Sequence, residues 1–487
     1  MPPKPRYIRM DRDDLAWEQS DQEIEAWERS LNKSHIYRGI ASLINKHRPG
    51  EAVELHKPIR GGYNVFYRLE YKDGSSAGMR IPCKGVKFPE EKVRYEVATM
   101  RYIAANTTIP VPKIYHFGTA AENPAGLGPF IIMDYVEHER TMSDALKDPA
   151  LEPDESHVLD PTIDEGRLEL LYGQMANIVL QLSTLKFPRI GSLNQDEHGD
   201  ISVSGRPLIQ NMNSLMEFAG VAPTLLPSRS YDASNGWFCA LADMHLAQLT
   251  FQHNDAILDE DDERDKYVAR QLFRRLASEG RLTPGLDAKK KEADDSSFRL
   301  YSEDLRPSNV LIDKDDHVVG VIDWEFAYAA PAQFSFDPPW WLLLKSPEYW
   351  DDGYTSWMEA CEPRLETFLR EKDRYEIAGD TITSSSLEED VPLSQRMRNS
   401  WEKRTWMINY TARNSWAFDF IFWRFLDTEY FGDNEEGDHH ARLSFLTQQQ
   451  IEAMEPFVKM KIEESKERSL VEWGHDDAAV RLTEVLV

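Results

Sequence analysis

The apolar positions of this chain follow two spacings. Between residues 51 and 85, short apolar runs are separated by turn residues such as Lys72-Asp73-Gly74, a pattern that predicts β-hairpins. Elsewhere apolar side chains recur every three or four residues, as they do in amphipathic helices. The segments with helical spacing are residues 21–30, 34–47, 90–104, 164–185, 237–250 and 265–277, and most of 345–470.

The segments between these helices carry other signals. Residues 205–235 contain three prolines and Gly220 and are predicted to be rich in loops. The acidic run at residues 259–263 is interpreted as a solvated linker or cap rather than a cation site. The many aromatic residues at helical spacing within 345–470 are predicted to form core, with an acceptor pocket as the alternative for some rings.

Residues 300–330 hold the most informative pattern in the chain. Two apolar runs, at residues 310–312 and 318–322, flank a polar turn and predict a hairpin. Asn309 precedes the first run, Asp323 follows the second, and Asp304 lies five residues before Asn309. The hairpin therefore brings three oxygen-bearing side chains to one end of a ribbon. Phosphoryl transfer requires such a set, although Asp and Asn are also ordinary turn residues.

The residues in this stretch resemble a known family. D-L-R-P-S-N-V-L-I-D followed by G-V-I-D-W-E is similar to the aminoglycoside phosphotransferase-like group, which shares the protein-kinase-like fold with choline kinases. The resemblance implies that Asp304 is the catalytic base and that Asn309 and Asp323 bind Mg²⁺. The family usually has His two residues before the catalytic Asp, where this chain has Ser302.

The resemblance extends upstream to residues that would bind the nucleotide. The turn that contains Gly61, Gly62 and Asn64 would cover the phosphates, because glycine lets backbone N–H groups approach closely. Arg80 stands where the family places the strand cation that contacts the phosphates, usually a lysine. Glu96, in the next predicted helix, would orient Arg80. The alternatives are that Gly61 and Gly62 form an ordinary turn, that Arg80 lies on the surface of a strand and that Glu96 lies on the solvated surface of a helix.

The run at residues 130–136 resembles the strand that joins the two lobes of the family, so the backbone of Asp134 and Val136 would meet the adenine edge. We therefore expect an α+β, two-lobed protein-kinase-like fold with a small antiparallel N-lobe and a large, mostly helical C-lobe. The expected divisions are a helical extension at 1–50, the N-lobe at 51–138 and the C-lobe at 139–487, with the catalytic loop at 300–325.

Composition narrows the class of partner. The chain of 487 residues has 84 acidic and 56 basic residues, for a formal net charge of −28. A field of that sign repels nucleic acid and anionic membranes and favours a cationic or neutral acceptor, although a charge that only maintains solubility is the simpler interpretation. The three cysteines are far apart, and no secretory signal or long apolar run is evident, so we expect a cytoplasmic protein.

These patterns favour an ATP- and Mg²⁺-dependent phosphotransferase that acts on a hydroxyl of a small molecule. Ser302 and Arg80 motivate the alternative of a catalytically weak or inactive kinase-like binding or scaffold protein. A protein kinase is a weaker alternative, because no A-P-E segment follows Asp323. The identity of the acceptor, the choice between ATP and GTP and the oligomeric state remain open.

Overall fold

The computed structural model describes residues 10–152, 155–283, 298–378 and 391–486. The chain forms two compact units. The first comprises Met1–Glu25, Ile209–Asp294 and Arg404–Val487, and the second comprises Ala26–Leu208 and Asp295–Lys403. This division does not follow the boundaries expected at residues 50 and 138, so the lobe boundaries stay predictions.

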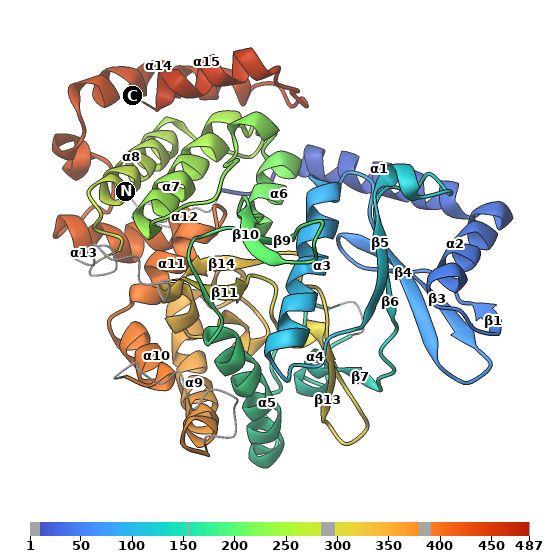
Figure 1. The fold of residues 1–487 in the computed structure, drawn as a ribbon. Coiled ribbons are helices and arrows are strands. Elements are labelled where there is room, and N and C mark those ends of the chain that lie inside the picture. Colours follow the sequence, from blue (N-terminus) through green and yellow to red (C-terminus); the bar gives the residue numbers. More distant parts are fainter. Residues whose placement is uncertain (1–9, 153–154, 284–297, 379–390, 487) are drawn as a thin grey trace. The chain divides into compact units, whose positions relative to one another are not determined.

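An antiparallel sheet dominates the first part of the second unit (Figure 1). Its strands, among the described residues, are β1 (Ala52–Leu55), β2 (Ile59–Arg60), β3 (Asn64–Tyr71), β4 (Ser76–Pro82), β5 (Ile114–Gly118) and β6 (Phe130–Asp134). The order is β1-β3-β4-β6-β5, with β2 paired to β3. Burial alternates along β3, so every second side chain enters the core and the other side chains line the opposite face.

Helices lie against both faces of this sheet. Helix α2 (Ser34–His47), which has the bounds that the sequence predicts, packs Ile36, Ile40, Leu43 and Ile44 on the face that carries Met79. Arg80 is the next residue along β4, so its side chain points to the other face. There it meets α3 (Pro89–Asn106), the helix expected at residues 90–104. The sheet therefore presents Arg80 to the side where the candidate catalytic hairpin lies.

The predicted hairpin is present. Strands β12 (Val310–Ile312) and β13 (Val318–Val321) pair antiparallel, with Val310 opposite Val321. β12 also pairs with β7 (Arg140–Thr141), the strand that follows β6 in the chain. A second small sheet joins β11 (Phe298–Ser302) to β14 (Ala327–Pro331) and β8 (Lys186–Phe187). The loop between β11 and β12 is therefore anchored at both ends.

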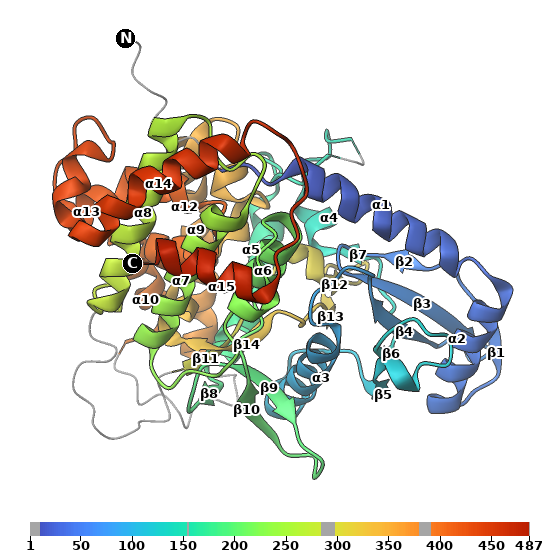
Figure 2. The ribbon, with the colours of Figure 1, turned by 90° about the horizontal axis from the view of Figure 1, so that it is seen from above.

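The second unit contains further elements besides these sheets (Figure 2). Asp164 caps α5 (Glu165–Ser183) by accepting a hydrogen bond from the Arg167 N–H, and β9 (Ser192–Gln195) pairs antiparallel with β10 (Ile201–Gly205). These elements are α4 (Met142–Leu146), α5 (Glu165–Ser183), β9 (Ser192–Gln195), β10 (Ile201–Gly205), α9 (Gly353–Ala378) and α10 (Leu393–Glu402).

The first unit is helical. Its helices, in the described part, are α6 (Gln210–Phe218), α7 (Ser234–Phe251), α8 (Glu260–Ser278), α11 (Thr405–Arg413), α12 (Phe418–Ile421), α13 (Asp427–Phe431), α14 (Gln448–Glu464) and α15 (His475–Val485). Helix α1 (Asp14–Leu31) contains the boundary between the two units and begins before the predicted residue 21.

Two segments of this unit were predicted to lack regular structure or to act as a cap. Residues 205–235 are mostly loop, as predicted, but α6 forms between the prolines with Met212 and Leu215 buried. Of the two interpretations of the acidic run at 259–263, a solvated linker or a cap, the structure confirms the cap. Asp259 caps α8 by accepting from the Asp262 N–H, and acidic side chains stabilise the positive end of the helix dipole. Glu263, the last residue of the run, is fully buried.

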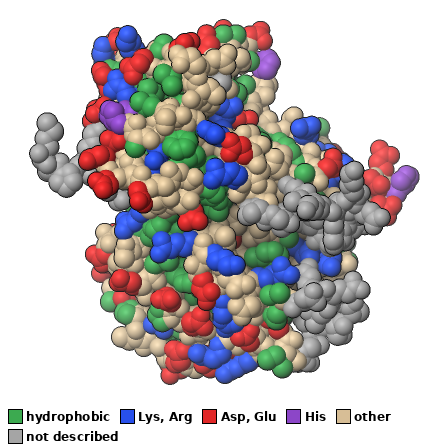
Figure 3. Space-filling view, turned by 90° about the vertical axis from the view of Figure 1, so that its left-hand side faces the viewer, with side chains coloured by type: hydrophobic (Ala, Val, Ile, Leu, Met, Phe, Trp, Pro, Cys, Tyr) green, Lys and Arg blue, Asp and Glu red, His purple; other side chains and the backbone are tan. Residues whose placement is uncertain are grey.

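The expected α+β class is confirmed by the antiparallel sheet and the helical remainder. Most aromatic residues of the 345–470 segment are buried, as expected for core; Trp357, Trp406, Phe418 and Phe422 are examples. No helix in the described ranges is long and apolar enough to cross a membrane. On the face in Figure 3, acidic and basic side chains are interspersed rather than segregated.

Candidate active site

Asp304 lies in the loop between β11 and the single-turn helix η3 (Pro307–Asn309). The Asn309 Nδ2 donates to the Asp304 backbone carbonyl at 2.8 Å and to its Oδ2 at 3.0 Å. Arg306 Nε forms an ion pair with Asp304 Oδ1 at 2.9 Å. The structure therefore brings the predicted base and one predicted metal ligand together, and both carboxylate oxygens of Asp304 have partners.

Asp323 lies two residues after the end of β13. The Ile322 N–H donates to the Asn309 carbonyl at 3.0 Å. This hydrogen bond places the backbone just before Asp323 beside Asn309. Asp323 adopts a left-handed backbone with φ of 62°, which is uncommon outside glycine and turns its side chain out of the strand direction. Its carboxylate is bonded by Arg80 Nη1 and remains 29% exposed. Solvent can therefore reach the second predicted metal ligand.

Arg80 connects the sheet to this hairpin. Besides Asp323, its Nη1 lies 3.3 Å from Glu96 Oε1, and its Nη2 lies 3.5 Å from Glu325 Oε2. The predicted pairing of Arg80 with Glu96 is present in the structure. Arg80 is almost wholly buried, and a charge in such a position needs partners. Three carboxylates share this one guanidinium.

A second buried cation accompanies the cluster. Lys92 Nζ lies 2.5 Å from Glu325 Oε2, and Asn64 Nδ2 donates to both Glu325 oxygens at 3.2 and 3.0 Å. The ammonium group also lies 4.6 Å from the centroid of the Tyr63 ring. Tyr63 and Asn64 end the turn that contains Gly61 and Gly62. This turn therefore lies beside the segment that contains Asp323, and the side-chain amide of Asn64, predicted to bind the nucleotide, donates to Glu325.

The electrostatics of the site follow from burial. Burial raises the pKa of Asp304 to about 6, although Arg306 opposes that shift. Burial also raises the pKa of Glu96 to about 7, against the opposing charge of Arg80. Burial acts on Glu325 in the same sense, but Lys92 and Arg80 outweigh it and hold the pKa of Glu325 below its usual value. Perturbed acids gathered in this way are common at functional sites.

The predicted adenine-binding backbone is partly engaged within the protein. The Asp134 N–H donates to the Lys113 carbonyl at 2.9 Å, and its side chain accepts from the Tyr115 hydroxyl at 2.5 Å. The Val136 carbonyl lies 2.7 Å from His138 Nδ1. A nucleotide that used the Val136 carbonyl would need His138 to turn away. The roles of Asp134 and Val136 stay predictions.

Sequence reasoning missed Lys92 and Arg306 as charged residues of this site, and it missed that Glu325 bridges two segments. Lys92 did carry a signal, because it lies four residues before Glu96 and hence on the same face of α3. Arg306 lies inside the quoted D-L-R-P-S-N motif, two residues after Asp304. No spacing rule indicates that Glu325 reaches back to Asn64, 261 residues earlier in the chain.

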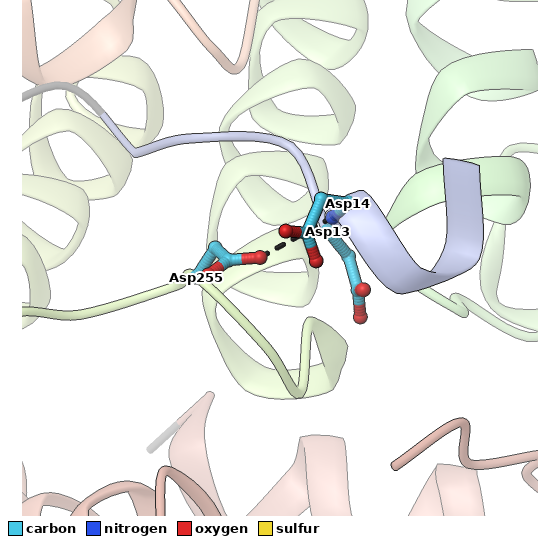
Figure 4. Close-up of side chains that lie close together, drawn as sticks. All are labelled: Asp13, Asp14 and Asp255. Atoms are coloured by element: carbon cyan, nitrogen blue, oxygen red, sulfur yellow. Dashed lines mark hydrogen bonds between the residues drawn. The ribbon is translucent and has the colours of Figure 1, made fainter. Parts of the chain in front are cut away.

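An acidic cluster elsewhere does not form a comparable site. Asp13, Asp14 and Asp255 lie together in the first unit (Figure 4), the one group of three such ligands found among the described residues. Asp13 caps α1 by accepting from the Ala16 N–H at 3.0 Å. Arg468 pairs with Asp14 and with Asp255. Each carboxylate thus has a partner within the chain, as in an ordinary helix cap.

The residues present fit a nucleotide and a magnesium ion. Mg²⁺ prefers oxygen ligands. The Nδ2 of Asn309 holds Asp304, so its Oδ1 is the atom left for a cation, and Arg80 bonds only one of the two Asp323 oxygens. Among the described residues, the buried Arg80 Nε has no hydrogen-bond partner. A Cβ on Gly62 would meet nothing within 4 Å, so the turn borders open space.

Comparison with known proteins tests the family resemblance. Residues 214–370 match the model of the phosphotransferase enzyme family. This match includes Asp304, Asn309 and Asp323 and confirms the resemblance stated from the sequence. A subtelomeric hrmA-associated cluster protein of Aspergillus fumigatus is 29% identical over 140 residues, which cover 29% of this chain and 24% of that protein. The chain thus spans about a quarter of that relative's length.

A longer alignment joins the chain to the mitochondrial protein "altered inheritance of mitochondria protein 9" of Kluyveromyces lactis. The two are 22% identical over 382 residues, which cover 71% of this chain and 60% of that protein. Among solved structures, Plasmodium vivax ethanolamine kinase is 12% identical, with a TM-score of 0.40. The superposition covers 98% of this chain and 94% of the kinase chain. A macrolide 2'-phosphotransferase type I is 14% identical, with a TM-score of 0.39. That superposition covers 85% of this chain and 98% of the phosphotransferase chain.

Proposed function

We propose that this chain, whose residues 214–370 belong to the phosphotransferase enzyme family, transfers a phosphoryl group from a nucleotide to a hydroxyl of a small molecule. The observation that carries the proposal is the convergence of Asp304, Asn309 and Asp323 on one hairpin beside the buried Arg80. Phosphoryl transfer depends chiefly on positioning and charge stabilisation, and this set of residues provides for both.

In this proposal the residues have separate tasks. Asp304 accepts the proton of the acceptor hydroxyl, and the Asn309 amide fixes the orientation of its carboxylate. Asn309 Oδ1 and the Asp323 carboxylate would hold Mg²⁺, and Arg80, oriented by Glu96, would contact phosphate. Bound ATP would supply the phosphoryl group, and the metal ion would neutralise charge on its phosphates.

The site residues also impose a requirement. Arg306 occupies Asp304 Oδ1, and Arg80 bonds Asp323. Arg306 would compete with an acceptor hydroxyl for Asp304 Oδ1, and its long, 44% exposed side chain has room to move away. The acceptor in this proposal is a small molecule. The net charge of −28 favours a cationic acceptor over an anionic one.

The same contacts favour a second candidate, an inactive kinase-like binding protein. In that case Arg80 and Arg306 would pair permanently with Asp323 and Asp304. The two arginines would then occupy the carboxylates that a metal ion and an acceptor would otherwise contact. Asp304→Asn separates the two candidates. If the cellular role of the protein survives that substitution, chemistry is not its function.

A direct test incubates the purified chain with MgATP and a panel of amines, amino sugars and choline-like alcohols, and measures ADP release. The proposal predicts acceptor-dependent ADP release that Asp304→Asn abolishes. If no acceptor raises ADP release above the rate without acceptor, and the Asp304→Asn variant releases as much ADP as wild type, the proposal is wrong.

A further inference from the structure

The carboxylate of Glu325 joins three segments that are distant in the chain. It accepts from Asn64 at the end of the glycine turn and pairs with Lys92 of α3. It also lies two residues after Asp323, in the segment that would hold the metal. Because the Glu325 side chain is only 3% exposed, these protein contacts take the place of solvent.

The glycine turn is fastened to this segment at a second point. The ring of Tyr63 packs edge-on against Phe326, the neighbour of Glu325, with ring centroids 5.3 Å apart. The Gly61 N–H donates to the Asn64 carbonyl at 2.8 Å and closes the turn itself. One polar contact and one aromatic contact therefore hold the same two residues of the turn, Tyr63 and Asn64, against consecutive residues after Asp323.

Lys92 acts through Glu325 rather than on a ligand. Its side chain is 2% exposed, and its ammonium lies 4.6 Å from the Tyr63 ring centroid and 5.0 Å from that of Phe326. An ammonium enclosed in this way cannot reach a phosphate without leaving both rings. Its position instead compensates the Glu325 charge, which Arg80 reaches only at 3.5 Å.

We propose that Glu325 is a positioning residue that latches the glycine turn to the segment carrying Asp323, with Lys92 as the counter-charge of the latch. This inference rests on the proposed function, because it assigns the turn and Asp323 to one bound nucleotide. A turn that is already ordered loses less conformational freedom when a nucleotide binds. The latch therefore serves nucleotide affinity and has little part in the chemical step.

Hydrogen–deuterium exchange on the nucleotide-free protein tests the latch without reference to catalysis. We compare wild type with Glu325→Gln, Lys92→Met and the double variant. Each variant should speed amide exchange in residues 59–66 by about tenfold or more, and the double variant should add little to either single change. The matched control is the exposed Glu51–Lys72 pair at 2.8 Å, which lies just beyond the ends of β1 and β3 and is changed to Gln and Met. The control should leave exchange in residues 59–66 unchanged.

Kinetics supply a second readout. The latch predicts that Glu325→Gln and Lys92→Met raise KM for ATP about tenfold while kcat changes less than about threefold. A merely structural role would instead raise exchange across the whole sheet. That result, or unchanged exchange at residues 59–66, would overturn the latch.

Two further outcomes are distinguishable. If the charge variants do not fold, Asn64→Ala removes the tether without leaving a buried charge unpaired, and it should produce the same local rise in exchange; no rise overturns the latch. If wild type does not bind MgATP, the proposed function fails and the assignment to nucleotide affinity fails with it. The exchange data then still decide whether Glu325 holds the turn.

Discussion

Arg306 Nε lies 2.9 Å from Asp304 Oδ1, so the predicted catalytic base carries a cation on one oxygen and the Asn309 amide on the other. This arrangement fixes the Asp304 carboxylate in one orientation and limits access to it. It also sets the charge of a buried acid, because Arg306 opposes the effect of burial on the Asp304 pKa. The first two predictions follow from this pair.

Asp304→Asn should abolish transfer to the acceptor while leaving nucleotide affinity almost unchanged. The amide has nearly the same shape, but it cannot accept the hydroxyl proton, and loss of a positioned base typically costs about 10²–10⁴-fold in rate. The measurement is kcat for ADP release beside a nucleotide titration. Asp315→Asn, in the exposed turn of the same hairpin, is the control and should behave as wild type.

Activity should fall as the pH drops through about 6, because burial raises the Asp304 pKa to about 6 and the protonated acid cannot serve as a base. Arg306→Gln should move this acid limb of kcat/KM to higher pH, since it removes a cation that favours the charged form. A pH–rate profile of both proteins checks the shift. An acid limb that stays in place in Arg306→Gln would show that the Arg306–Asp304 pair does not control the base.

Arg80→Met should destabilise the protein by about 3–5 kcal/mol, because it leaves Glu96, Asp323 and Glu325 without their shared guanidinium. Arg80→Lys should retain more stability but raise KM for nucleotide, because one ammonium lacks the planar fork of arginine. Chemical unfolding and steady-state kinetics measure the two effects. Arg38→Met, at an exposed position on α2, is the control and should change neither quantity.

Glu263→Gln should stabilise the protein at alkaline pH and have little effect near pH 5. Burial raises the folded-state pKa of Glu263 to about 8, well above its usual value, against the charges of Lys461 and Lys266. The neutral acid is therefore favoured in the folded state, and this contribution to stability is lost as pH rises through about 8. Thermal unfolding at pH 5 and pH 8.5 tests this. Equal melting-temperature differences at both values would contradict it.

The sequence was most informative where its signals were local. The hairpin that places Asn309 and Asp323 follows from apolar runs around a polar turn, and α2 and α3 follow from helical spacing. The acidic run before α8 left a linker and a cap both open, because a helix start and a solvated linker share the same composition, and only the contact made by Asp259 distinguishes them. The contact between Asn64 and Glu325 was inaccessible because it joins residues 261 positions apart.

The central claim is that Asn309 and Asp323 hold a metal ion that serves a nucleotide bound beside Arg80. Calorimetric titration of the chain with ATP, with and without Mg²⁺, tests it most directly. The account predicts saturable binding that requires Mg²⁺ and that Asp323→Asn greatly weakens. Absence of binding to ATP or GTP at millimolar concentration with Mg²⁺ present, or equal binding by wild type and Asp323→Asn, would contradict it.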